Sequence, residues 1–400
     1  MRLATCSNIN FKKSILFSFW ELLTIFSIKL SQKKNGLFED STLRTRQGDN
    51  DNTYAMFTGA CLCIYNFKKK SKLVDSLIIK LCYFIKENIS SSGSIAYHGR
   101  AANSSYLESS ALLILSYCFM RFNLDNSYEI DLITQRIFKY KSEYGLPTSL
   151  NFDPFSKMSG YHGSFLQYSA LSAVLINLSV KFLQKKIDDK YYIEKFSSLN
   201  SYKERNINNT YITKRVSNSS ITFAAKGYLA SWKRGDYTTG YGGICSWSVN
   251  GEEILSSVFK RDNLKLNQSL FIGIEEFKNQ QKVASSFNKI LIKSKNKILS
   301  SSIELISRDT LKLHLPYTEK YTIGLRCDFI GYHKNIISSF NKNILSIKNK
   351  ITKKELILKN IDSFKLHKFT IDAPSGETII LEIKLLKFIP NKIIFLSVKN

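Results

Sequence analysis

Two short polar segments place histidine beside residues that bind anions or exchange protons. The first, "GSIAYHGRAANSSY", contains His98, Arg100 and Asn103, and the second, "SGYHGSFLQY", contains Tyr161 and His162. The chain has only five histidines, so two at similar places draw attention. Imidazole and phenol groups transfer protons, while guanidinium and amide groups bind anionic oxygens. Each segment also precedes an apolar helical run, so helix capping is the alternative interpretation.

The elements around these segments change character along the chain. Apolar residues at three- and four-residue spacing predict helices up to about residue 190. Short alternating or β-branched segments beyond about 215, such as "KILIKS" and "TLKLHL", predict an antiparallel sandwich. The expected fold class is α+β and multidomain, with a helical domain over 1–196, a linker over 197–220 and an antiparallel β-sandwich over 221–400. The expected helices are 13–31, 51–68, 71–88, 104–122, 127–141 and 163–184.

The helical half contains a repeat that relates the polar segments to each other. Each copy has a Gly turn, a polar loop and a helix that opens on an aromatic residue, followed at +4 and +5 by Ser or Thr and a small residue. These anchors are Tyr54 with Thr58 and Gly59, Tyr106 with Ser110 and Ala111, and Phe165 with Ser169 and Ala170. Successive helix hairpins build a solenoid or an α/α toroid, with their loops gathered at one end. Six helices predict an incomplete toroid, open on one side.

The charge of the chain restricts its partners. A formal net charge of +26 and a pI near 9.6 suit nucleic acid, an anionic membrane surface or an acidic polysaccharide. Lysine enrichment of the kind common in AT-rich genomes is the alternative explanation. The lysines form short dispersed clusters, and the sequence has no P-loop, zinc-finger spacing or G-x-G-x-x-G after a strand, so nucleic acid is disfavoured.

Seven scattered cysteines, mostly within apolar stretches, predict buried free thiols. The other three histidines, His314, His333 and His367, occur singly without ligand spacing, so neither a metal nor a cofactor is expected.

The N-terminal apolar run has the beginnings of a signal peptide, but Glu21 interrupts it and no cleavage site follows. Its helical spacing favours an amphipathic core helix without stable membrane insertion. A signal or anchor over 12–30 is the weaker alternative, and neither localisation nor oligomeric state is assigned.

A helical array followed by an antiparallel sandwich, with "GSIAYHGRAANSSY" ahead of an inner helix, resembles the polysaccharide lyases of the α/α-toroid type. These include the heparinase II/III-like and the hyaluronate/chondroitin/alginate lyase families. The likeness reaches motif level over 93–111, 158–171 and 226–255, and about half of a full toroid is missing. The resemblance implies a carbon–oxygen lyase that cleaves an acidic, uronate-containing polysaccharide by β-elimination. The cleft would lie between the toroid loops and the sandwich.

The resemblance also implies roles for the polar residues. Abstracting the proton next to a uronic carboxylate requires donors that neutralise the developing charge, and a base near that carbon. Asn103 and His98 would neutralise the carboxylate, and Arg100 would grip the acidic sugar. Tyr161 or His162 would transfer protons, with Tyr161 the better candidate for the acid.

Four further residues would bind substrate by the same resemblance. Gln167 lies about one helical turn after His162, so it would line the same face. Arg234, Tyr237 and Tyr241, in "KRGDYTTGYGG", would close over the cleft from the sandwich, because glycines permit a tight loop. A β-hairpin turn without contact to the cleft is the alternative interpretation of this stretch.

Two other classes of function fit the sequence. A glycoside hydrolase on a helical scaffold needs two carboxylates at a fixed separation. Its candidates are Glu39, Asp40, Asp49, Asp51, Glu108 and Asp153. A non-catalytic polysaccharide-binding or assembly protein would use the basic surface without turnover.

Overall fold

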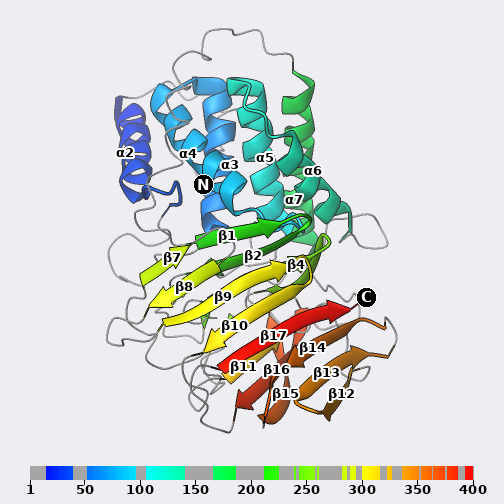
Figure 1. Ribbon diagram of the computed structural model, residues 1–400. Helices are drawn as coiled ribbons and strands as arrows, with labels where there is room; N and C mark the ends of the chain where they lie inside the picture. The colour runs from blue at the N-terminus through cyan, green and yellow to red at the C-terminus, as the bar shows by residue number, and fades with distance from the viewer. Residues whose placement is uncertain are drawn as a thin grey trace.

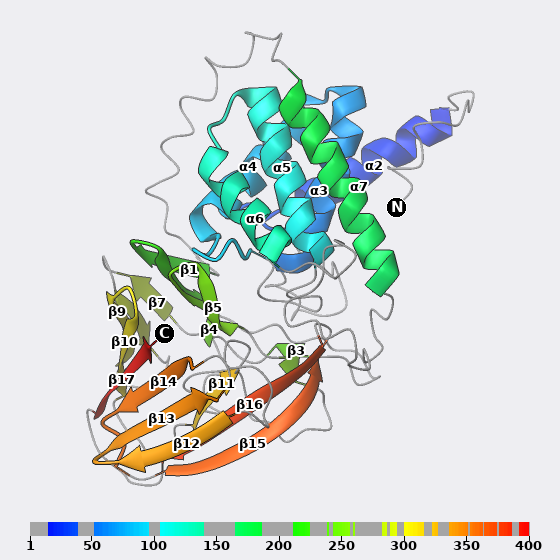
Figure 2. The same ribbon diagram turned by 90° about the vertical axis from the view of Figure 1, so that its right-hand side faces the viewer.

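The protein is α+β, with helices in its N-terminal half and antiparallel strands in its C-terminal half (Figure 1). The computed structural model describes residues 15–38, 52–95, 105–139, 165–185, 211–224, 238–239, 243–256, 259–260, 282–285, 289–293, 300–315, 322–326, 336–350, 353–362, 364–373, 376–385 and 392–399. In both views the helices lie on one side of the strands (Figures 1 and 2).

The predicted helices form, and their ends agree with the expected ranges to within two residues. They are α2 (Ile15–Ser31), α3 (Asn52–Lys69), α4 (Lys72–Asn88), α5 (Ser105–Phe122), α6 (Ser127–Lys139) and α7 (Phe165–Gln184). Helix α5 is buried along nearly all of its length, because α3, α4, α6 and α7 all contact it. A helix that is apolar on most sides is stable only in such a central position.

Helices α3, α5 and α7 run parallel to one another. Near their starts, the ring of Tyr106 contacts Phe57 and Tyr168. Near their ends, the ring of Phe182 contacts Phe67 and Tyr117. Helices α4 and α6 return between them, as the hairpin repeat predicts.

The small residues of the repeat have different environments in its three copies. A Cβ atom added to Gly59 would meet the Leu81 Cδ2 atom at 2.4 Å and the Ile114 Cδ1 atom at 2.7 Å, so glycine allows α4 and α5 to approach α3. Ala111 is fully buried, whereas Ala170 is exposed on α7. Close approach through the small residue is therefore shown at Gly59, and the small residue is buried in the first two copies but not in the third.

Helix α2 differs from its expected place in the core. Ile25 is its buried apolar residue, with Ile28 partly buried against the same core. Its exposed large apolar side chains are Phe19, Trp20, Leu22, Leu23, Phe26 and Leu30. Helical spacing predicted the helix correctly but not its position, because spacing alone does not show what packs against a helix. Within the described ranges, no helix is long and apolar enough to cross a membrane.

The thiol prediction is confirmed for the cysteines whose surroundings the structure describes. Cys63, Cys82 and Cys118 are free and buried, and Cys61 is free and half-buried. Burial raises the pKa of the Cys63 and Cys118 thiols well above the ordinary range. These thiols pack in the core between the helices.

A small antiparallel sheet joins the helices to the other strands. Its order is β1-β2-β4-β5, from strands β1 (Tyr211–Val216), β2 (Ser219–Ala224), β4 (Gly243–Val249) and β5 (Glu252–Ser256). Strand β1 contacts α4 and β9, and β5 contacts β11. Strand β1 starts inside the range 197–220 predicted as a linker, with Tyr211 and Ile212 buried; the division into domains itself stays a prediction.

The remaining strands form an eight-stranded, a three-stranded and a two-stranded antiparallel sheet, the last from β3 and β6. One has the order β12-β13-β14-β17-β10-β9-β8-β7, and another the order β11-β16-β15. Buried residues alternate along the strands, as in Leu311 and Leu313 or Ile394 and Leu396, so one face of the eight-stranded sheet lies in a core. The bounds are β3 (Thr238–Thr239), β6 (Phe259–Lys260), β7 (Lys282–Ser285), β8 (Lys289–Lys293), β9 (Ser300–Ser307), β10 (Thr310–Leu315), β11 (Thr322–Arg326), β12 (Ile336–Asn341), β13 (Ile344–Asn349), β14 (Glu355–Lys359), β15 (Phe364–Ala373), β16 (Gly376–Leu385) and β17 (Lys392–Lys399).

Candidate functional site

The starts of the three parallel helices meet at one end of the helical array. The rings of Tyr106 and Tyr168 stack with their centroids 4.6 Å apart, and Phe57 packs edge-on against Tyr106 at 5.9 Å. The Ser172 hydroxyl donates to the Ser105 hydroxyl at 3.1 Å in the buried space between α5 and α7. The chain therefore enters α5 and α7 at neighbouring points.

The aromatic contacts involve different positions from the repeat anchors. Tyr106 is an anchor, but Phe57 and Tyr168 each lie three residues after the anchors Tyr54 and Phe165. A position three residues later lies on nearly the same side of a helix, one turn further along. The repeat thus predicted where the helices converge, but not which rings make the contact.

A buried serine-rich turn connects α4 to the segment that contains His98. All of its residues, 90–94 with the sequence SSSGS, are inaccessible or nearly so. The turn satisfies several polar groups internally, because the Ser90 N–H donates to the Ser94 carbonyl at 2.8 Å and the Ser94 N–H donates to the Ser90 hydroxyl at 2.9 Å. Gly93 has φ +79°. A Cβ atom there would lie 2.2 Å from the Leu132 carbonyl oxygen, so the turn is seated directly against α6.

One arginine of α6 contacts the chain on both sides of the segment 96–104. The Arg136 guanidinium forms a buried ion pair with Glu108, in the first turn of α5. Its Nη1 also lies 3.5 Å from the Ser92 hydroxyl, in the serine turn. Arg136 is 3% exposed and Glu108 is 5% exposed, so the pair is shielded from water. The exit from α4 and the entry to α5 are therefore tied to the same side chain.

A second buried polar cluster lies near the opposite ends of α3 and α5. The Asn66 amide donates to the Asp75 carboxylate at 2.5 Å and to the Tyr117 hydroxyl at 3.1 Å. Arg121 forms an ion pair with Asp75 at 3.7 Å. Burial raises the pKa of Asp75, and the Arg121 charge opposes this shift. Because the cluster is remote from the helix starts, we interpret it as part of the packing between helices.

An ion-pair group joins α6 to two parts of the strand region. Glu252, at the start of β5, pairs with Lys139 of α6 at 3.5 Å and with Lys354, just before β14. Burial alone would raise the pKa of Glu252, but the hydrogen bond from Lys354 and the charge of Lys139 outweigh it and lower the pKa. The ionised form of Glu252 is thus favoured in the folded protein.

Glu252→Gln is expected to destabilise the protein only above acidic pH. Because the folded-state pKa is lowered, this stabilisation is fully present above the ordinary value of 4.5 and is lost as pH falls through the folded-state value. Glu252 is about one-third exposed, so we expect about 1 kcal/mol or less. Urea denaturation at several pH values, in low and high salt, measures it. A wild-type to variant difference that does not change between neutral pH and pH 3 contradicts the expectation.

Most of the predicted site residues lie outside the described residues. Those outside are His98, Arg100, Asn103, Tyr161, His162, Arg234, Tyr237 and Tyr241. Gln167 is the third residue of α7. The described residues Ile95, Ser105 and Phe165 flank the two histidine-containing segments, so the structure describes where these segments attach to the helices.

The carboxylates considered for a hydrolase are also mostly outside the described ranges. Glu108 is the described member, and it is buried against Arg136, so it is poorly placed to reach a substrate. Among the described residues, no group of three or more His, Cys, Asp or Glu is arranged to hold a metal ion.

Sequence reasoning missed the residues that hold the chain on either side of the first histidine-containing segment. The run of serines before Gly93 was a usable signal, because a polar turn directly after an apolar helix must satisfy its hydroxyl groups somewhere. The pairing of Glu108 with Arg136 joins positions 28 residues apart on different helices. No local pattern indicates such a pair.

Comparisons with known proteins give similarity at the level of structure. No family model and no curated protein matches the sequence. Among solved structures, the chain is similar to polysaccharide lyases of the heparan sulfate type. One is a mutant of a heparan sulfate lyase from Pedobacter heparinus, with 11% identity and a TM-score of 0.33. Another is a heparinase III with methylated lysines, with 8% identity and a TM-score of 0.33.

These similarities extend over nearly all of this chain but not over those proteins. Each similarity extends over 96% of this chain. The matched part is 63% of the first lyase chain and 62% of the second. The chain therefore spans less than two thirds of the length of either lyase.

Proposed function

We propose that the protein acts on an acidic, uronate-containing polysaccharide by β-elimination, as a polysaccharide lyase-like enzyme. In this proposal, residues 1–196 form an incomplete α/α toroid, 197–220 link the two parts, and 221–400 form an antiparallel β-sandwich. The substrate lies at the loop-bearing end of the helices, next to the strand region. No metal or cofactor takes part.

The meeting of the helix starts is the observation that supports this proposal. The contacts of Tyr106 with Tyr168 and of Ser105 with Ser172 bring the entries to α5 and α7 together. Asn103 precedes Ser105 by two residues, and His162 precedes Phe165 by three. The two histidine-containing segments thus lead into adjacent helix starts, which favours a shared site over two unrelated caps.

The proposed chemistry divides the polar residues into two groups. Asn103 and His98 donate hydrogen bonds to the uronic carboxylate and stabilise the charge that develops on proton removal. Arg100 binds the acidic sugar, since a guanidinium pairs well with carboxylate and sulfate oxygens. Tyr161 or His162 removes the proton, and Tyr161 returns a proton to the leaving oxygen.

Residues of the helix and the strand region complete the proposed binding surface. Gln167 lies within the first turn of α7. Arg234, Tyr237 and Tyr241 approach the substrate from the other side. The net charge of +26 favours an anionic polymer through long-range attraction.

Incubation with uronate-containing polysaccharides tests the proposal. The panel is heparan sulfate, chondroitin sulfate, hyaluronate and alginate, and the measurement is ultraviolet absorbance of the unsaturated product. We expect absorbance to rise with at least one polymer and not with the double variant His98→Ala, His162→Ala. New reducing ends without absorbance would indicate hydrolysis, and retention on the polymer without cleavage would indicate a binding protein. Either of these results contradicts the proposed elimination.

A further inference from the structure

Three buried hydroxyl groups join the serine turn to the small sheet. The Ser91 N–H donates to the Ser220 hydroxyl of β2 at 2.7 Å. The Ser248 hydroxyl of β4 lies 2.7 Å from that of Ser91 and 2.8 Å from that of Ser220. All three residues are less than 5% exposed, so water does not replace a lost partner easily. The sheet therefore provides hydrogen-bond partners that the buried turn requires.

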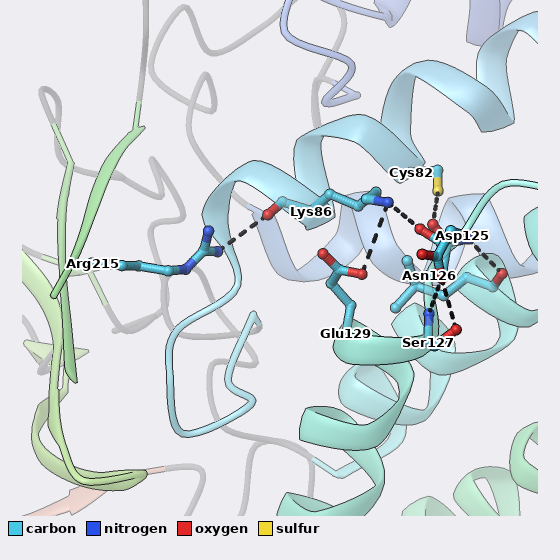
Figure 3. A network of polar contacts seen from close by, with 8 residues as sticks. Cys82, Lys86, Asp125, Asn126, Ser127, Glu129 and Arg215 are labelled. Carbon is cyan, nitrogen blue, oxygen red and sulfur yellow. Dashed lines mark hydrogen bonds and ion pairs between the residues drawn. The ribbon is translucent and has the colours of Figure 1, made fainter. Parts of the chain in front are cut away.

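Arg215 of β1 binds the end of the helix that precedes the turn. Its Nη2 donates to the carbonyl oxygens of Ile89 at 2.5 Å and Lys86 at 3.1 Å, and its Nε donates to Ile89 at 3.2 Å. The last carbonyls of a helix lack intrahelical partners and carry partial negative charge, so a guanidinium there satisfies them and complements the helix dipole. Figure 3 shows Arg215 extending from β1 to the backbone of Lys86.

The same helix end is fixed from the side of α6. The Lys86 ammonium donates to the Asp125 carbonyl oxygen and lies 3.9 Å from the Glu129 carboxylate (Figure 3). Asp125 in turn accepts from the Ser127 N–H at 3.2 Å, at the start of α6. The end of α4 is thus held between the small sheet and α6.

We propose that the small sheet positions the segment 96–104, which contains His98, through these contacts. Arg215, Ser220 and Ser248 are then positioning residues. Ile95 follows the turn directly and lies three residues before His98, so the turn sets where the chain enters that segment. On the other side of the segment, Glu108 of α5 pairs with Arg136, which also contacts Ser92 of the turn. This inference rests on the proposed function, and it gives the strand region a part in the reaction without direct contact with substrate.

Two sets of variants test this role. Ser220→Ala with Ser248→Ala removes the two sheet hydroxyl groups that bond to the turn, and Arg215→Ala removes the guanidinium from the carbonyls at the end of α4. Arg215→Lys keeps the charge but bonds fewer carbonyls at once, so it should recover part of the effect. Arg308→Ala is the matched control, because Arg308 is an exposed arginine in the turn between β9 and β10.

The expected effects are local and act on turnover. Hydrogen exchange of residues 86–95 should become faster in the test variants, while exchange of the buried part of α5 stays unchanged. We expect kcat on the cleaved polymer to fall about 10- to 100-fold, because small misplacements of reacting groups have effects of that size. KM should rise by a smaller factor than kcat falls, because Arg100 lies in the displaced segment whereas the other residues proposed to bind substrate lie outside it.

Two results overturn the positioning role. The first is unchanged exchange of residues 86–95 in the test variants. The second is an equal loss of protection along the whole helical array, which indicates only a structural role. A wild-type protein that eliminates none of the polymers overturns the proposed function instead. In that case the exchange of residues 86–95 still decides whether the sheet holds the turn.

Discussion

Replacing Arg136 by methionine is expected to lower the free energy of unfolding by about 3–5 kcal/mol. The guanidinium is buried and pairs with the buried carboxylate of Glu108, so its removal takes this ion-pair partner from a charge in the interior. The contact with Ser92 is lost as well. Urea denaturation followed by circular dichroism at neutral pH measures the change.

A second substitution distinguishes two causes of the lost stability, the broken ion pair and a packing defect. Replacing Glu108 by leucine together with Arg136→Met removes both charges, so the double variant should recover most of the lost stability. Arg308→Met is the control, because an exposed arginine should change stability by about 0.5 kcal/mol or less. A double variant as unstable as Arg136→Met alone would show that packing, and not the broken ion pair, accounts for the loss.

The sequence predicted the helices well because their periodicity is strong. The three- and four-residue spacing of apolar residues reflects which face is buried, and this property depends on local sequence alone. Helix α2 shows the limit, because its spacing is equally helical but large side chains such as Trp20 and Phe26 are exposed. Burial depends on what packs against a helix, and local sequence does not contain that information.

Part of the arrangement of the candidate site followed from the repeat. Equivalent positions in successive hairpins must recur at the same end of the array, so the convergence of the α5 and α7 starts was within reach of sequence reasoning. The particular contact of Tyr106 with Tyr168 was not, because Tyr168 lies three residues after the anchor Phe165. The contacts of Arg215 with the end of α4, and of Ser248 with the turn that follows it, could not be predicted from the sequence. They join residues more than 120 positions apart, and no periodicity relates a strand of one region to a turn of another. The positions of His98 and His162 themselves stay a prediction.

The largest expected effect on activity comes from Tyr161→Phe. If Tyr161 returns the proton to the leaving oxygen, removing its hydroxyl should lower kcat by about 10²- to 10⁴-fold. KM should change little, because the aromatic ring and the residues proposed to bind the carboxylate are retained. The rate of ultraviolet absorbance increase on the cleaved polymer measures both constants.

The matched control for this variant is Tyr128→Phe. Tyr128 is 54% exposed on α6, so loss of its hydroxyl should leave both constants within about twofold of wild type. If the Tyr161→Phe variant keeps full kcat, His162 and not Tyr161 is the proton donor. In that case His162→Ala should abolish elimination. If both variants keep full activity, the second histidine-containing segment contributes only helix capping. The reaction would then have to use His98 or a residue outside the two segments.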